Sequence, residues 1–197
     1  MALTTSSIWF EVRPMTLGDI EAVMKIEREA FTSAWPVTAY ELELKQNKLA
    51  RYIVAVEHET PVGPRNGRVA RVEIVGFLGL WLNVGEGHIV TVAVSISHRR
   101  RGIGELLVMS AVDTAVANQQ EVVTLECRLS NVAAQTLYEK YGFRKVGVRP
   151  HYYSDNNEDA VIMTTLPLTT KAFQIPFQRL KETHRERWGI STIRRLD

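Results

Sequence analysis

Residues 99–104 combine three arginines with two glycines, a composition that suits the binding of a phosphate group. Valines alternate with other residues at 90–94, as in a β-strand, and the residues after the glycines carry apolar side chains three and four positions apart, as in a helix. A strand that passes through a glycine turn into a helix directs free backbone N–H groups and the positive helix end at one point. A dinucleotide fingerprint would need glycine at Leu107, and a P-loop would need lysine at Glu105. A tight surface turn is the simpler alternative.

The single cysteine and the five histidines argue against two other kinds of chemistry. Cys127 alternates with Leu125 and Leu129 on the apolar face of a strand predicted at 122–129, which indicates a buried thiol rather than a nucleophile. One cysteine cannot form an internal disulfide and is typical of a reducing cytosol. The histidines are scattered without the spacing of metal ligands, so we expect no metal site.

Length and composition indicate one globular domain with an appendage: 197 residues, 45% hydrophobic and 23% charged. Residues 171–197 contain seven Lys or Arg and three Asp or Glu, a charge of +4, so residues 1–170 carry −2 of the total of +2. The sequence has neither the pattern of a signal peptide nor an apolar stretch long enough to span a bilayer, so we expect a cytoplasmic protein that binds no membrane. Three adjacent arginines are too small a footprint for nucleic acid, and we expect a monomer or weak dimer.

The elements that must position these residues form a mixed α/β pattern, with strands at both ends of the chain and a βαβα centre. Capping-box sequences at 16–19 and 38–41 predict two helix starts. Asn131 and Gly142 predict the start and end of another helix. We expect a central mixed β-sheet flanked by helices. The strands are expected at 8–13, 51–57, 69–82, 90–94, 122–129, 143–148 and 160–166, and the helices at 17–26, 38–45, 103–118 and 131–141.

Two segments lie outside this pattern. Residues 60–67 have the Pro- and Gly-rich composition of a loop longer than a hairpin needs, which predicts a surface insertion. We expect the domain to occupy 1–168 and a basic C-terminal extension to occupy 169–197. Within the extension, apolar and aromatic residues at helical spacing predict a short amphipathic helix at 177–188, after Pro176.

Residues 99–104, of the form Arg-x-x-Gly-x-Gly, resemble the pyrophosphate-binding motif of the GNAT acetyltransferases, which bind acetyl-coenzyme A (acetyl-CoA). Residues 125–143, with Asn-x-x-Ala and Leu-Tyr-x-x-x-Gly-Phe, are similar to the strand and helix that follow in that family. Residues 149–163, with two tyrosines before Glu-Asp-Ala and an apolar strand, resemble the RimI branch, which acetylates the N-terminal alanine of small-subunit ribosomal protein 18. Residues 27–35 resemble the substrate loop of that branch. The resemblance covers 8–167 and implies the GNAT acyl-CoA N-acyltransferase fold.

The resemblance also implies roles for individual residues. Acetyl transfer to an amine needs a base, a stabilised oxyanion and a proton for the departing thiolate. Glu126 corresponds to the base, acting directly or through a water, and Tyr138 to the acid, while a backbone N–H around Val94 serves the oxyanion. The implied acetyl-CoA contacts are Val92, Ala93, Val94, Arg99, Arg100, Arg101, Gly102, Ile103, Gly104, Asn131 and Tyr138, and the implied peptide contacts are Trp35, Tyr152 and Tyr153.

Each role has a structural alternative. Glu126 is otherwise an exposed strand carboxylate or a partner of Arg128, Tyr138 a core aromatic, and Asn131 a helix N-cap.

For the whole chain we expect a protein N-α-acetyltransferase that modifies a ribosomal protein N-terminus by direct transfer. The alternatives are an acetyltransferase for a lysine or small-molecule amine, and a non-catalytic acyl-CoA-binding module. An α-amine has a pKa of ~8 against ~10.4 for lysine, so it is the easier amine to deprotonate.

Overall fold

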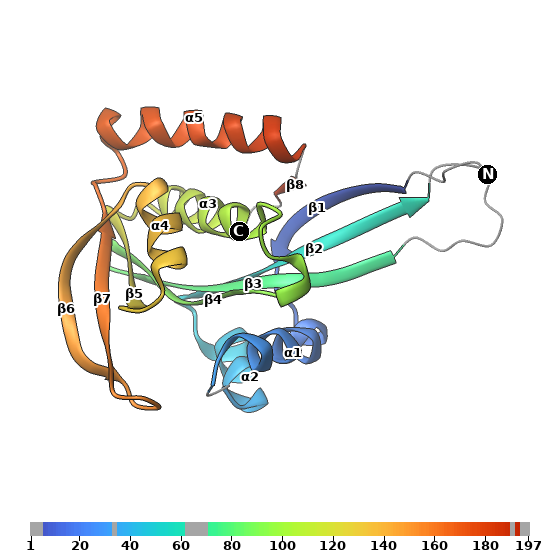
Figure 1. Ribbon diagram of the computed structural model, residues 1–197, viewed down its shortest axis with the longest axis horizontal. Helices are drawn as coiled ribbons and strands as arrows, with labels where there is room; N and C mark the ends of the chain where they lie inside the picture. Colours follow the sequence, from blue (N-terminus) through green and yellow to red (C-terminus); the bar gives the residue numbers. More distant parts are fainter. Residues whose placement is uncertain (1–5, 33–34, 62–70, 190–191, 194–197) are drawn as a thin grey trace.

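The computed structural model describes residues 6–32, 35–61, 71–189 and 192–193. These residues form one eight-stranded mixed sheet, ordered β6-β7-β5-β4-β3-β2-β1-β8. Helices α3, α4 and α5 lie on one side of the sheet, and α1 and α2 lie on the other (Figure 1). The strands are β1 (Ser6–Pro14), β2 (Ala50–Pro61), β3 (Arg71–Asn83), β4 (Glu86–Val94), β5 (Val122–Arg128), β6 (Phe143–Tyr153), β7 (Glu158–Thr165) and β8 (Thr192–Ile193). The helices are α1 (Ile20–Ala30), α2 (Val37–Gln46), α3 (Ile103–Ala117), α4 (Val132–Lys140) and α5 (Lys171–Trp188), with short 3-10 helices η1 (Leu17–Asp19) and η2 (Ile96–His98).

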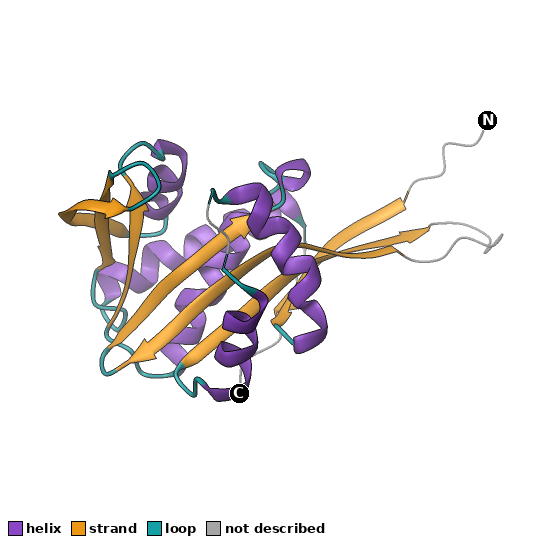
Figure 2. Ribbon diagram, turned by 90° about the horizontal axis from the view of Figure 1, so that it is seen from below, coloured by secondary structure: helices purple, strands orange, loops and turns teal. Residues whose placement is uncertain are grey.

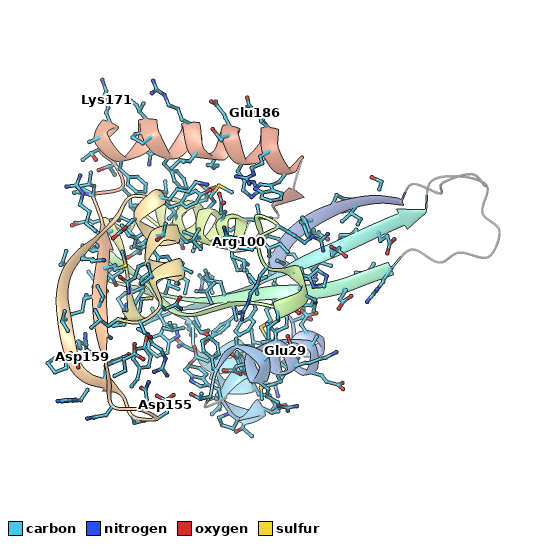
Figure 3. All side chains as sticks on the ribbon, viewed as in Figure 1. Glu29, Arg100, Asp155, Asp159, Lys171 and Glu186 are labelled. Carbon is cyan, nitrogen blue, oxygen red and sulfur yellow. The ribbon has the colours of Figure 1, made fainter. Side chains whose placement is uncertain are left out.

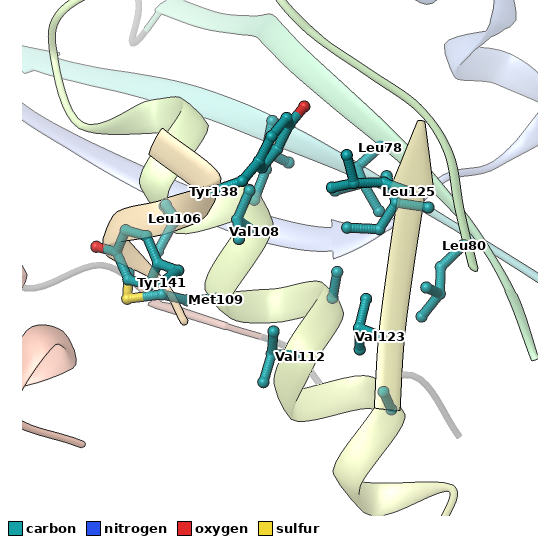
Figure 4. Close-up of a cluster of buried hydrophobic side chains, with 14 of the residues drawn as sticks. Leu78, Leu80, Leu106, Val108, Met109, Val112, Val123, Leu125, Tyr138 and Tyr141 are labelled. Carbon is teal, nitrogen blue, oxygen red and sulfur yellow. The ribbon is translucent and has the colours of Figure 1, made fainter. Parts of the chain in front are cut away.

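Two apolar clusters fill the layers on the two faces of the sheet, which confirms the expected mixed sheet flanked by helices. The larger cluster surrounds α3, which is apolar on almost every side because the sheet, α4 and α5 all pack against it. Figure 4 shows side chains of this helix, including Val112, facing Val123 and Leu125 of β5. The smaller cluster packs α1 and α2 against the opposite face, around the fully buried Tyr40. No helix in the described ranges is both long and apolar enough to cross a membrane.

Strands β4 and β5 are parallel neighbours at their beginnings and then separate. Their pairing joins residues 86–89 to residues 122–125 only. Beyond these residues β4 continues along β3, and β5 continues along β7. The register between β3 and β4 shifts at Val90, which forms a β-bulge, and a bulge bends its strand. Figure 2 shows the strands at the left, which are β5, β6 and β7, turned away from the rest of the sheet. The central strands therefore leave an opening between them.

The two predicted capping boxes have different outcomes. The first forms: the Asp19 carboxylate accepts a hydrogen bond from the Thr16 N–H at 2.7 Å. The second prediction is wrong, because Pro36 is the N-cap of α2 and Thr38 already lies within the first turn. Proline fixes φ, here at −69°, and with ψ at 151° Pro36 is still extended. Helix α2 begins directly after it, with no side-chain hydrogen bond at the N-cap.

Strand ends also differ from expectation. Leu129, expected on the apolar face with Leu125, is 52% exposed because β5 ends at Arg128 and the chain turns toward α4. The hairpin of β6 and β7 is longer than expected, and β6 extends to Tyr153. The insertion predicted at 60–67 lies almost entirely outside the described residues.

Helix α5 begins at Lys171, well before the expected start, and Pro176 lies inside it rather than ahead of it. Thr170 caps the helix, since its hydroxyl oxygen accepts a hydrogen bond from the Phe173 N–H at 3.3 Å. A proline in a helix removes one backbone donor. Burial of Phe173 and Phe177, which are 3% and 2% exposed, offsets that loss and extends the helix across the proline.

Substitutions in α5 should reveal how firmly this helix packs on the domain. We expect Phe177→Ala to lower the free energy of unfolding by about 3–5 kcal/mol, because the ring is almost fully buried. Ile175→Ala is the matched control in the same helix, since Ile175 is 51% exposed, and it should change stability by about 0.5 kcal/mol or less. Denaturant unfolding measures both. Equal small losses would contradict the described packing of α5.

Candidate active site

The opening between β4 and β5 is a cavity of about 530 Å³. Its walls come from the end of α1 and the loop that follows, the separated parts of β4 and β5, the start of α4, and the β6–β7 hairpin. Seven of the residues predicted from the sequence line it together: Trp35, Val92, Glu126, Asn131, Tyr138, Tyr152 and Tyr153.

Glu126 lies on β5 at the wall of the cavity, with its side chain only 7% exposed. Its Oε2 atom is 3.1 Å from Nε2 of His88, and its Oε1 atom is 3.1 Å from Nε of Arg149. Arg128 is not its partner, since Arg128 binds Asp155 in the β6–β7 hairpin at 2.8 Å. Glu126 is therefore neither an exposed strand carboxylate nor a partner of Arg128. Two partners on different strands hold the carboxylate in one position.

The parallel register of β4 and β5 brings His88 to Glu126. His88 is opposite Thr124, and Glu126 is the next residue of β5 on the same face. Nδ1 of His88 is 2.8 Å from the Thr124 hydroxyl, and that hydroxyl donates to Glu86. Because that hydroxyl donates to Glu86, it accepts from Nδ1–H of His88. His88 thus lies between Glu126, its ion-pair partner, and Thr124, which connects it to the partly exposed Glu86.

Tyr138 and Cys127 lie on the apolar side of the cavity. Tyr138 is 6% exposed and packs at 5.8 Å, between ring centroids, from Phe143. Its hydroxyl points out of the apolar cluster (Figure 4). Burial raises the pKa of the Tyr138 phenol above its usual value, so the group stays protonated. Burial also raises the pKa of the Cys127 thiol to about 11, so the thiol lacks the ionised form of a nucleophile.

Asn131 is the N-cap of α4, and its side-chain oxygen accepts a hydrogen bond from the Ala134 N–H at 3.1 Å. The residue also lines the cavity, so the structural role and the predicted contact coexist at one position. Gly142 follows the helix at φ +88°, as expected for a residue just past a helix end.

Residues 99–104, which the sequence predicts to bind phosphate, form a turn that we call the phosphate-binding turn. Arg100 and Gly102 have φ values of +64° and +78°, and left-handed residues in such a turn form a concave row of N–H groups. Within the described part of the chain, the N–H groups of residues 103–105 have no acceptor, as in the first turn of any helix. A diphosphate fits this row because its oxygens are anionic and only accept hydrogen bonds.

The three arginines of the turn are differently engaged. Arg101 pairs with Glu57 of β2 at 2.5 Å and lies over the ring of Phe10, so its guanidinium is bound within the protein. Arg99 donates from Nε to the carbonyl oxygen of Val94 at 3.2 Å, which ties the turn to the end of β4. Arg100 is exposed at the start of α3 (Figure 3).

The phosphate-binding turn, Ala93 and Val94 do not line the cavity itself. The turn lies beside it, because β4 leads directly from the cavity wall into the turn. A Cβ on Gly104 would be 3.4 Å from Leu137 of α4 and 3.9 Å from Val94. Gly104 therefore lies beside β4 and α4, two elements that also line the cavity.

Aromatic and acidic side chains border the other end of the cavity. The rings of Tyr152 and Tyr153 are 5.2 Å apart, between centroids. Thr32, after α1, donates to Asp155, so the α1–α2 loop meets the β6–β7 hairpin. Glu27 is 3% exposed, its Oε1 accepts from the Trp35 N–H at 3.2 Å, and the buried Tyr40 hydroxyl interacts with its carboxylate. Burial raises the pKa of the Glu27 carboxyl.

Sequence reasoning missed His88 and Arg149, the two partners of Glu126. Neither residue lies near Glu126 in the chain, and only the β4–β5 register and the β6–β7 hairpin bring them together. Glu27 was noticed as part of a loop motif, but its burial depends on tertiary packing. No group of three or more His, Cys, Asp or Glu suited to a metal ion occurs in the described ranges.

Comparisons with known proteins find a matching family and several similar proteins. The model of the acetyltransferase (GNAT) family matches residues 20–143. A Bacillus subtilis protein named provisionally as a ribosomal protein bS18-alanine N-acetyltransferase is 36% identical over 152 residues, covering 77% of this chain and 92% of that protein. An N-alpha-acetyltransferase from Sulfurisphaera tokodaii is 35% identical over 159 residues, covering 78% and 91%.

A solved structure shares the fold. The crystal structure of the ribosomal-protein-S18-alanine N-acetyltransferase from Escherichia coli matches with a TM-score of 0.66 and 25% identity, over 82% of this chain and 95% of that one. The family match spans more than half of the 197 residues, and the relatives align over nearly their whole length. The chain therefore belongs to the acetyltransferase (GNAT) family and is an acetyl-CoA-dependent N-acetyltransferase.

Proposed function

We propose that this chain is a protein N-α-acetyltransferase of the RimI type, which acetylates the N-terminal alanine of small-subunit ribosomal protein 18. The observation that carries the proposal is the buried carboxylate of Glu126, held at the wall of a cavity that also receives the Tyr138 side chain. The names of the Bacillus subtilis and Escherichia coli relatives support the choice of substrate.

Glu126 is the base in this proposal. A peptide α-amine has a pKa of ~8, so most of it is charged at neutral pH and one proton must leave before transfer. The carboxylate accepts that proton directly or through a water, while Arg149 and His88 keep its two oxygens in place. His88, the ion-pair partner of Glu126, is bonded through Thr124 to the partly exposed Glu86, which lies on the solvent side of the base.

Tyr138 is the acid. Acetyl-CoA supplies an activated thioester carbonyl, and its sulfur leaves as a thiolate that needs a proton. The phenol of Tyr138 remains protonated because burial raises its pKa, so a proton is present at its hydroxyl when the thiolate departs. The hydroxyl points out of the apolar cluster (Figure 4).

The phosphate-binding turn and the end of β4 hold the coenzyme in this proposal. The N–H groups of residues 103–105 bind the diphosphate, and the backbone of residues 92–94 directs the acyl arm toward the cavity. Beyond Ile89 the edge of β4 that faces β5 has no strand partner, so its N–H groups can serve the developing oxyanion.

The far end of the cavity receives the peptide. Trp35, Tyr152 and Tyr153 supply aromatic walls, and Asp155, whose pKa is lowered by Thr32 and Arg128, supplies a carboxylate at the entrance. Acidic side chains around an N-terminal peptide favour a cationic residue after the first. We therefore expect peptides that begin Ala-Arg to be preferred.

A panel of peptides tests the proposed substrate. With acetyl-CoA, we expect rapid acetylation of a peptide beginning Ala-Arg, slower acetylation of Ser-Arg and Met-Lys peptides, and none of the same peptides with blocked N-termini. Mass spectrometry locates the added acetyl group. Modification of an internal lysine would favour an acetyltransferase for another amine. Binding of acetyl-CoA without modification of any peptide would favour a non-catalytic binding module.

Substitutions at the two proton-transfer residues test the mechanism. We expect Glu126→Gln to lower kcat by about 100-fold or more and Tyr138→Phe by about 10- to 100-fold, because each removes one proton transfer. The KM for acetyl-CoA should change much less. Glu121→Gln, the same change at an exposed position just before β5, is the control and should retain normal turnover. Near-normal turnover of the Glu126→Gln and Tyr138→Phe double variant would refute these assignments.

Cys127 provides a third test, of direct transfer against a covalent enzyme intermediate. With a pKa of about 11, only about one thiol in a thousand is ionised at pH 8. We expect iodoacetamide to modify the folded chain at least about 100-fold more slowly than the chain in denaturant, and Cys127→Ala to keep most of its activity. Detection of acetyl-Cys127 after mixing with acetyl-CoA alone would overturn direct transfer.

A further inference from the structure

Helix α5 contacts the phosphate-binding turn at Gly102. Nε2 of His184, a residue only 5% exposed, is 2.9 Å from the Gly102 carbonyl oxygen. Trp188 packs on the same residue, since a Cβ on Gly102 would be 2.6 Å from the indole ring. We call these two contacts the Gly102 brace. They occur at the residue where the backbone is left-handed, with φ at +78°.

The hydrogen bond to the carbonyl oxygen also sets the direction of the next N–H. In a planar trans peptide, the C=O of one residue and the N–H of the next point in opposite directions. The Gly102 oxygen accepts from His184 and, at 3.0 Å, from the Leu106 N–H within α3. Two donors fix this peptide plane, so the N–H of Ile103 points out of the helix end, where a diphosphate would bind.

Helix α5 is anchored to the domain independently of the brace. Phe173 and Phe177 are buried near its first turns, where Phe173 packs against Gly142 and Phe177 against Tyr141. Lys181 donates to Asp113 of α3 at 2.6 Å. After the helix, β8 adds to the sheet edge beside β1. These anchors give His184 and Trp188 a rigid support from which to hold the turn.

We propose that α5 holds the phosphate-binding turn in its ligand-binding conformation, with His184 and Trp188 as positioning residues that raise affinity for acetyl-CoA without touching it. The inference rests on the proposed function in one respect, that the turn binds the diphosphate. It goes beyond the family assignment, because the GNAT match ends at residue 143 and α5 begins at Lys171. The C-terminal extension is then part of the coenzyme site rather than an independent appendage.

The affinity of the folded protein for CoA, measured by calorimetry, tests the proposal. We expect His184→Leu to raise Kd by about three- to tenfold, the effect of losing one hydrogen bond of ordinary strength. His184→Gln keeps an N–H donor near the Nε2 position and should stay within about twofold of wild type. Glu186→Gln, on the exposed face that points away from the sheet (Figure 3), is the matched control and should bind normally.

Kinetics separate positioning from general damage. In His184→Leu, the KM for acetyl-CoA should rise with Kd, while kcat and the peptide KM stay near wild type, because the cavity residues are unchanged. Amide hydrogen exchange, measured without ligand, should become faster in a peptide covering residues 99–106. The Glu186→Gln variant should show wild-type exchange there. Should His184→Leu fail to fold, Trp188→Leu carries the same expectations and leaves the histidine in place.

Three outcomes would overturn specific claims. A folded His184→Leu protein with unchanged Kd and unchanged exchange at 99–106 would refute the role of α5. A wild-type protein that binds no CoA would refute the proposed function instead, and the exchange measurement would still decide whether α5 holds the turn. Equal losses in His184→Leu and His184→Gln would show that the hydrogen-bond donor is irrelevant and would also refute the proposal.

Discussion

The separation of β4 from β5 is the constraint on which the rest of this structure depends. Four paired positions hold the two strands together, and the bulge at Val90 then turns β4 away from its neighbour. A sheet that stayed paired would bury these backbone groups in a ladder and leave no cavity at its centre. Because the strands diverge, Glu126 faces a cavity, and β4 leads through η2 into the phosphate-binding turn.

Charged side chains that line the cavity form ion pairs with defined partners. Glu126 lies between His88 and Arg149, and Arg128 pairs with Asp155 in the hairpin. A buried ion gains stability only when its hydrogen bonds are well made, so these groups rigidify the walls. The same fixed geometry suits proton transfer, because a base and an acid must meet their partners without reorganising.

In the proposed site, the C-terminal helix extends the coenzyme-binding part of the domain. Its apolar face completes the core around α3, and its last turns reach the backbone of Gly102. Arg101 is held from another side, by Glu57 on β2. A glycine turn is intrinsically flexible, and its binding conformation costs conformational entropy unless neighbouring elements fix it. In the proposal, contacts from α5 and β2 fix the turn before a ligand binds, so its conformational entropy is lost on folding rather than on binding. The site is preorganised in this sense.

The sequence by itself determined the elements and the local signals: the alternation of β4, the glycine turn, the cap at Asn131 and the stop at Gly142. It also determined the family, because motif spacing is a local property. Tertiary structure alone decided which residues contact Glu126 and that the last turns of α5 contact Gly102. Partners such as His88 and Arg149 come from other strands, and strand register and packing depend on contacts far apart in the chain. The start of α5 differed from the start predicted from the sequence for the same reason, since burial of Phe173 outweighed the local effect of Pro176.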